Sequence, residues 1–196
     1  PFDLAAEDLA LLVIDTKAKH SLDDGQYGAR RAACERAAQI LGVELLADIA
    51  IEDLPQALER LSSTDDADEL IKRTRHVVTE IDRTRRLVDL LQDGRPLRGE
   101  KLAEAGRLMD ASHESLRVDY ECTCPELDVA VEAARAAGAH GARMTGGGFG
   151  GSAIALVDAK TVHDVAAAVA QAYEREGFNP PAFLDAVPAA PAGRLP

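Results

Sequence analysis

A run of glycines near the C-terminal end of the chain is the strongest constraint on its fold. Residues 145–151 read TGGGFGG, and a short apolar run follows directly at 152–157. Glycine adopts positive φ without steric cost and leaves the backbone N–H groups uncovered. The pattern predicts a tight turn between two extended segments. Either a phosphate group or another stretch of backbone could approach this turn closely.

Two common glycine motifs do not fit this run. Gly146, Gly148 and Gly151 have the G-x-G-x-x-G spacing of a dinucleotide-binding turn, but that turn requires a helix after the glycines, and here a strand is expected. A phosphate-binding loop of the Walker A type requires a Lys before its Ser or Thr, and no Lys precedes Ser152. We therefore expect a hairpin rather than either of these nucleotide loops.

The rest of the chain alternates between apolar runs and helical periodicity. The apolar run at 9–14 has the length of a buried strand. Apolar residues recur at helical spacing in several segments, most regularly at 66–91, and the expected helices lie at 29–41, 53–61, 66–91, 102–116, 125–138 and 161–174, with a closing strand at 180–187. This order predicts an α+β fold, with a mostly antiparallel sheet and helices on one of its faces.

Composition excludes several classes of function. The chain has 196 residues, 34 of them acidic and 22 basic, for a net charge of −12. A nucleic-acid partner is not expected at this charge, and no apolar run reaches the roughly 20 residues that span a bilayer. The three cysteines are not typical of a disulfide framework, so we expect a cytoplasmic protein. Because no apolar run is long enough to span a bilayer, we expect no membrane partner.

Side chains that could carry chemistry are few. Tyr27 follows the first strand, where a loop tyrosine could bond a sugar hydroxyl or simply pack its ring. Cys122, Cys124 and His113 suggest a metal site, but the C-x-C spacing is short for structural zinc and no second pair exists. We expect no metal site, and we expect His76 and His113 to be structural histidines within helices.

Five strings, taken in order, resemble the C-terminal half of galactokinases, in the GHMP small-molecule kinase superfamily. The resemblance covers most of the chain, from about residue 9 to residue 187. The glycine string alone is typical of GHMP kinases in general, and the strings at 13–31, 75–80 and 124–128 narrow the resemblance to galactokinases. The strings are VIDTKAKHSLDDGQYGARR at 13–31, RHVVTE at 75–80, LMDASHESL at 108–116, CPELD at 124–128 and GARMTGGGFGG at 141–151.

The resemblance implies a fold and a reaction. The fold is the ferredoxin-like plait of the GHMP kinase C-terminal domain with extra helical insertions, over residues 1–188. Composition, and not the resemblance, predicts the flexible Pro/Ala tail at 189–196. The reaction is transfer of the ATP γ-phosphoryl group to the anomeric hydroxyl of α-D-galactose, with Mg²⁺. Tyr27 corresponds to the family's sugar-contacting tyrosine. The family's third motif, near the phosphates, corresponds to Thr145, Gly146, Gly147, Gly148, Phe149, Gly150 and Gly151.

Other family motifs have no match among these residues. They are the first motif, the Gly- and Ser-rich second motif, the catalytic Asp and the Mg²⁺-binding Ser and Glu. The resemblance therefore implies an absent N-terminal half that binds most of the ATP and Mg²⁺ and is the partner of this chain. We assign no catalytic residue and expect the isolated chain to be inactive. An N-acetylgalactosamine-type kinase and a non-catalytic galactose sensor remain alternatives.

Overall fold

Four antiparallel strands organise the fold of this computed structural model, which describes residues 3–18 and 24–186. Their order in the sheet is β2-β3-β1-β4. With helices between β1 and β2 and between β3 and β4, this is the predicted ferredoxin-like plait. The strands are β1 (Leu9–Asp15), β2 (Gly141–Thr145), β3 (Ser152–Asp158) and β4 (Ala182–Asp185).

The described residues form six α-helices, five of which lie between β1 and β2. Pro125 opens the fifth of these at a position where its missing N–H costs nothing, and Gly177 ends the last helix in a left-handed conformation with φ 71°. The helices are α1 (Asp24–Leu41), α2 (Leu54–Leu61), α3 (Ala67–Gln92), α4 (Glu100–Val118), α5 (Pro125–Ala136) and α6 (Val162–Glu176).

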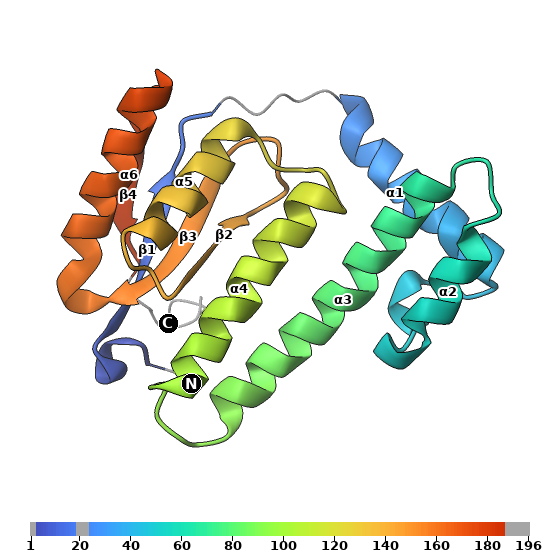
Figure 1. Cartoon of the computed structure of the whole chain (residues 1–196), viewed down its shortest axis with the longest axis horizontal. Coiled ribbons are helices and arrows are strands. Elements are labelled where there is room, and N and C mark those ends of the chain that lie inside the picture. The colour runs from blue at the N-terminus through green and yellow to red at the C-terminus, as the bar shows by residue number, and fades with distance from the viewer. Residues whose placement is uncertain (1–2, 19–23, 187–196) are drawn as a thin grey trace, which may run out of the picture.

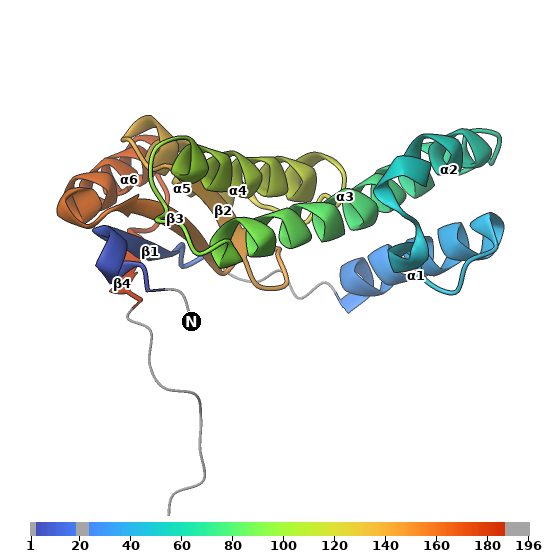
Figure 2. The same ribbon diagram turned by 90° about the horizontal axis from the view of Figure 1, so that it is seen from below.

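Helices α4, α5 and α6 cover one face of the sheet, as predicted (Figures 1 and 2). Side chains alternate along a strand, so Leu12 and Ile14 of β1 both point into this helical layer. They are fully buried with Leu127, Val131 and Val169 of the helices. Burial of aliphatic surface between sheet and helices therefore forms the core of the plait.

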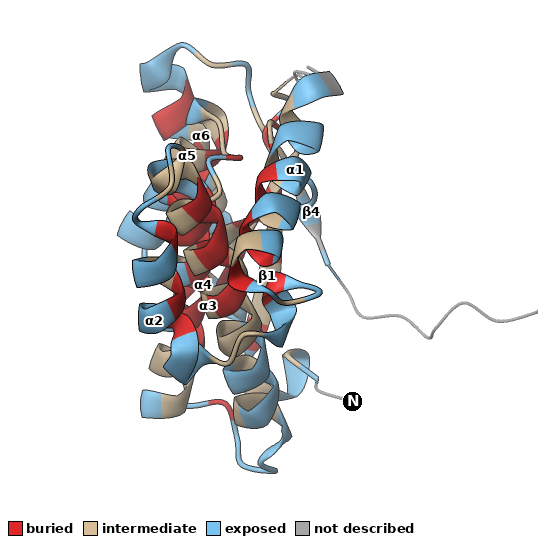
Figure 3. Ribbon diagram, turned by 90° about the vertical axis from the view of Figure 1, so that its right-hand side faces the viewer, coloured by how far each residue is buried: buried red, intermediate tan, exposed pale blue. Residues whose placement is uncertain are grey.

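Helices α1, α2 and α3 form a separate helical insertion with its own small core. Ala37, Leu61 and Leu70 are completely buried in this cluster, which is rich in alanine. Figure 1 shows α1 and α2 beyond α3, on the side away from the sheet, and Figure 3 shows the buried faces of the helices turned inward. The extra helical insertion predicted from the sequence is thus confirmed, and it forms a second packing region.

The described residues cover the opposite face of the sheet at one end only. Leu97 closes that end by packing near Leu9 and Leu156. Farther along, Val13 stays partly exposed and Leu184 of the edge strand is 58% exposed. The plait therefore presents an apolar surface on the face away from α4, α5 and α6.

The structure starts α1 earlier in the chain than the sequence predicted. The sequence suggested a turn at 23–25 and a loop around Tyr27, but α1 begins at Asp24, so Tyr27 lies in the first turn of a helix. Residues 19–23, the predicted tail at 189–196 and the end of the predicted last strand lie outside the described residues. Within the described part of the chain, no helix combines the length and apolarity that a membrane crossing requires.

Candidate functional site

The glycine motif, residues 145–151, is the turn of a hairpin, as predicted. Thr145 pairs with Ser152 where β2 and β3 meet, and the residues between them make the turn. Gly146, Gly148 and even Phe149 have positive φ, at 93°, 86° and 59°. Only glycine adopts such angles freely, so the composition of the motif follows from the tightness of its backbone path.

Part of the motif packs directly against backbone. The Phe149 N–H donates to the Cys122 carbonyl over 2.7 Å. A Cβ on Gly148 would lie 2.4 Å from that same carbonyl oxygen, so this position requires glycine. At the other end, the Gly151 carbonyl accepts from both the backbone N–H and the hydroxyl of buried Thr16, at 3.0 and 2.6 Å.

The first residues of the motif face open space instead. Thr145, Gly146 and Gly147 are exposed, and a Cβ on either of these two glycines would meet nothing within 4 Å. Close packing therefore explains the glycine at 148 and positive φ explains the glycine at 146, but neither explains the glycine at 147. The uncovered backbone at 146 and 147 could accommodate a ligand that approaches closely.

The segment that joins α4 to α5, residues 119–124, ties the motif to the helical insertion. Arg73 of α3 is 3% exposed, and its guanidinium donates to the Asp119 carbonyl over 2.5 Å and to the Glu121 carboxylate over 2.7 Å. Arg30 of α1 donates to the carbonyls of Tyr120 and Glu121, each over 2.9 Å. We call this segment, with Arg30 and Arg73, the joint.

The joint also brings Tyr27 to the same side of the molecule as the glycine motif. Arg30 follows Tyr27 by three residues on α1, and its guanidinium carbon lies 5.8 Å from the centroid of the Phe149 ring. Tyr27 itself is 68% exposed. The sequence prediction singled out Tyr27 and Phe149 but missed Arg30, whose spacing from Tyr27 is a signal only once residue 27 is known to be helical.

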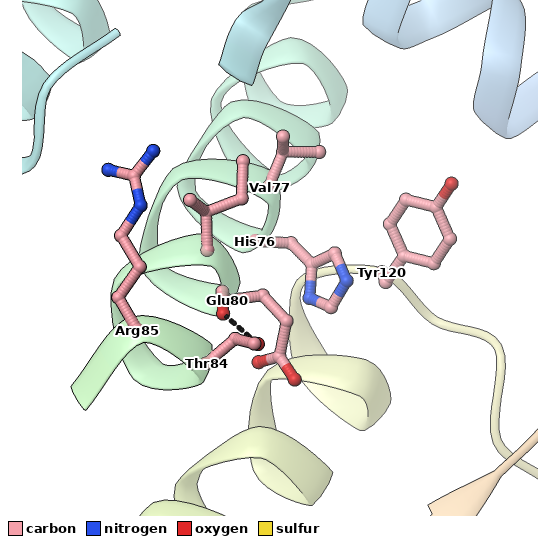
Figure 4. A pocket seen from close by; sticks show the side chains of 7 residues that line it. His76, Val77, Glu80, Thr84, Arg85 and Tyr120 are labelled. Carbon is pink, nitrogen blue, oxygen red and sulfur yellow. Dashed lines mark hydrogen bonds between the residues drawn. The ribbon is translucent and has the colours of Figure 1, made fainter. Parts of the chain in front are cut away.

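A pocket of about 520 Å³ adjoins the joint on the α3 side. The His76 ring stacks on Tyr120 with centroids 4.4 Å apart, and Figure 4 shows these two rings at one end of the pocket and Arg85 at the other. Glu80 and Thr84 complete its polar lining. The pocket thus shares Tyr120 with the joint.

His76 is a neutral, structural histidine, as predicted. Burial lowers its pKa to about 4. Its Nδ1 lies 3.0 Å from the Ser115 hydroxyl, which in turn donates to Asp119 over 3.1 Å. The Asp119 carboxylate also accepts from Arg75 over 2.8 Å. These contacts link α3 to the end of α4, next to the joint.

The residues considered for a metal have other partners. The Cys122 thiol lies in the core beside Met144, and burial raises its pKa to about 11, so it is a protonated core side chain. His113 contacts the Met144 backbone and Asp128. Among residues 3–18 and 24–186, no three His, Cys, Asp or Glu side chains gather as a metal site would require.

Comparisons with known proteins agree on one family. The family described as GHMP kinases C terminal matches residues 87–175. A galactokinase of Streptomyces coelicolor is 50% identical over 195 residues, which are 100% of this chain and 48% of the relative. The chain thus spans about half the length of the curated relatives it matches.

Solved structures extend the agreement to the fold. The crystal structure of Lactococcus lactis galactokinase complexed with galactose matches with a TM-score of 0.83 and 34% identity, over 94% of this chain and 46% of that one. L. major mevalonate kinase in complex with R-mevalonate matches with a TM-score of 0.52 and 21% identity, over 90% of this chain and 41% of that one, which indicates a shared fold alone. The chain contains a match to the GHMP kinase C-terminal family and is similar over nearly its whole length to the C-terminal half of galactokinases.

Proposed function

We propose that this chain is the C-terminal half of an ATP-dependent galactokinase, which phosphorylates the anomeric hydroxyl of α-D-galactose. The observation that carries the proposal is the joint, which brings the exposed Tyr27 and the open end of the glycine motif to one side of the molecule. Tyr27 thereby presents a hydrogen-bonding group that suits a sugar, and the glycine motif presents backbone that suits a phosphate. Galactokinase relatives 50% and 34% identical support the same reaction.

The exposed motif residues Thr145, Gly146 and Gly147 fit a role beside the phosphates of ATP. Their backbone is uncovered, and the space where a Cβ would stand on Gly146 or Gly147 is empty. Backbone N–H groups held in such a turn suit an anion, because they are fixed donors that need no reorganisation. Phe149 and Gly151 anchor the motif from behind, through their bonds to Cys122 and Thr16.

Tyr27 is the proposed sugar contact. Its side chain is exposed at the start of α1, and the helix beyond it is fixed to the joint through Arg30. A phenol presented in this way can donate or accept one hydrogen bond to a sugar hydroxyl. We propose that its hydroxyl contributes to galactose binding and not to ATP binding.

We propose that neither Mg²⁺ nor the catalytic base is held by this chain. The described residues bring together no carboxylate set that could hold a divalent ion. Phosphoryl transfer depends on positioning and on stabilisation of charge by Mg²⁺ and cationic groups. We propose that an N-terminal half supplies these groups, together with most of the ATP site, and that this chain alone is inactive.

The uncovered face of the sheet is the proposed seat of that N-terminal half. Val13 and Leu184 lie partly exposed there, on the face that α4, α5 and α6 do not cover. An apolar surface of this kind is stabilised when a second domain buries it. The free thiols Cys34, Cys122 and Cys124 support a cytoplasmic location for the complete enzyme.

The test is an assay of a full-length protein that contains this chain. ATP-dependent phosphorylation is measured on galactose, N-acetylgalactosamine, glucose, mevalonate and homoserine, with this chain alone as the matched control. The proposal predicts turnover of galactose above the other substrates by the full-length protein and none by the control. Preference for N-acetylgalactosamine would contradict the substrate, and galactose binding without turnover would indicate a sensor.

A further inference from the structure

The backbone N–H groups on the outer edge of β2 donate to side chains of one helix, α4. Because β2 is the outermost strand of the sheet, no neighbouring strand offers acceptors for these N–H groups. The Ala142 N–H donates to the Asp110 carboxylate over 2.9 Å, and the Met144 N–H donates to Nδ1 of His113 over 3.2 Å. Both acceptors lie on α4, three residues apart.

Helix α4 approaches β2 closely because each carries a glycine, which has no Cβ, where the two cross. A Cβ on Gly106 would lie 1.7 Å from the His140 carbonyl oxygen, and one on Gly141 would lie 2.4 Å from the Gly106 carbonyl oxygen. The backbones therefore touch at this crossing. Side chains on the same helix can then bond the strand directly.

The bond from Met144 fixes the protonation pattern of His113. An amide N–H can only donate, so Nδ1 of His113 is an unprotonated acceptor and the ring proton of the neutral imidazole is on Nε2. Nε2 lies 3.2 Å from Oδ1 of Asp128, a polar contact that does not have the geometry of a hydrogen bond, and neither of these buried atoms has a hydrogen-bond partner among the described residues. Asp128, at the start of α5, thus orients the His113 ring from behind.

The contacts from Asp128 through His113 to Met144 end beside the open end of the glycine motif. Met144 stands next to Thr145, the first exposed residue of the glycine motif, at the point where the motif leaves the strand. The rear of the motif is held by Cys122 and Thr16, but these bonds act only on Phe149 and Gly151. The His113 bond is one of the polar restraints beside the open end of the motif, together with the pairing of Thr145 with Ser152 and the bond from Arg143 to the Met144 carbonyl.

We propose that Asp128 and His113 are positioning residues for the glycine motif, which set the placement of Thr145–Gly147 through the Met144 amide. The proposal rests on the proposed function, because that function gives these three residues their role beside the phosphates. Neither side chain touches substrate. Their contribution is to keep the backbone donors of the motif where the transferred group would lie.

The experiment uses a full-length protein that contains this chain. His113→Leu removes the acceptor, whereas His113→Asn keeps a carbonyl acceptor near the place of Nδ1. Asp110→Leu is the matched control, because it removes the other acceptor of β2, at Ala142, farther from the motif. Asp128→Ala leaves His113 in place but frees its ring. Steady-state kinetics are normalised to the folded fraction, and hydrogen exchange is followed over residues 141–151.

The proposal predicts that His113→Leu lowers kcat at least tenfold, leaves the KM for galactose within twofold and speeds exchange at residues 144–147. His113→Asn should restore most of kcat, Asp128→Ala should lose about threefold, and Asp110→Leu should lose less than that. Equal kcat losses in His113→Leu and Asp110→Leu, or no rescue by Asn, would overturn it. If the wild-type protein turns over no galactose, the proposed function fails, and unchanged exchange at 144–147 in His113→Leu would separately overturn the positioning role.

Discussion

The plait and the helical insertion are built by different means, and the candidate site depends on both. The plait buries strands against helices, with Leu12 and Ile14 packed on α5 and α6. The insertion packs helices on helices around small residues such as Ala37. The glycine motif comes from the plait and Tyr27 from the insertion, so their relation depends on the polar joint between the two regions.

The same Gly→Ala substitution should have opposite effects in the two regions. In the plait, Gly106→Ala would place a Cβ 1.7 Å from a backbone oxygen, and we expect a loss of at least about 3 kcal/mol in the free energy of unfolding. In the insertion, Gly28→Ala meets open space on a helix, and we expect a gain of at most about 1 kcal/mol. Urea unfolding measures both, and a loss in Gly28→Ala would contradict the described packing of α1.

Acid should weaken the contact between the two regions at His76. Its pKa is about 4 when folded, against an ordinary value of 6.5, so the unfolded chain binds more protons between these pH values. Stability is therefore complete above pH 6.5 and falls as the pH drops toward 4, by about 3 kcal/mol from this group. Urea unfolding at pH 7 and pH 4 should show a smaller loss in His76→Gln than in the wild type. Equal losses would contradict a buried neutral His76.

Removing an arginine should lower stability when the residue belongs to the joint and should leave stability unchanged when it lies on the surface. Arg73→Met leaves the Asp119 carbonyl and the Glu121 carboxylate without their shared donor, and we expect a loss of about 2 kcal/mol. Arg31→Met is the matched control, because Arg31 pairs with Glu35 in the solvent, and we expect no measurable change. Thermal unfolding checks both variants. Similar shifts in the two would show that the joint does not hold the regions together.

The smallest expected effect is confined to one ligand. Tyr27→Phe in the full-length protein removes one proposed hydrogen bond to galactose, worth about 1 kcal/mol, so we expect the KM for galactose to rise several-fold. The KM for ATP should stay unchanged, and so should the melting temperature, because the side chain is exposed. Steady-state kinetics with each substrate varied in turn provide the test. Equal effects on both KM values would contradict the sugar-specific role.

The strands and helices of the plait could be predicted because each follows from a local sequence pattern. The apolar run at 9–14, the glycine turn at 145–151 and the periodicity of 66–91 each predict one element, and their order predicts an α+β fold with a mostly antiparallel sheet, whereas the plait topology was predicted from the resemblance to GHMP kinases. The start of α1 was missed because Asp23-Asp24-Gly25 is typical of a turn and also of a helix start.

The joint could not be predicted, because its contacts are distant in sequence. Arg30 bonds residues 120 and 121, and Arg73 bonds residues 119 and 121. On the sequence alone, Arg73 is one of several basic residues of a charged helix, and nothing local distinguishes it from Arg75 or Arg83. Only the packing of α3 against the 119–124 segment buries one of them.

The central claim is that Tyr27 and the open end of the glycine motif belong to one site. A crystal structure of a full-length protein that contains this chain, with galactose and a non-hydrolysable ATP analogue bound, tests it most directly. The account predicts the Tyr27 hydroxyl within hydrogen-bond distance of the sugar, about 2.7–3.0 Å, and residues 145–147 beside the γ-phosphate. Galactose bound away from Tyr27, or a γ-phosphate remote from the glycine motif, would contradict it.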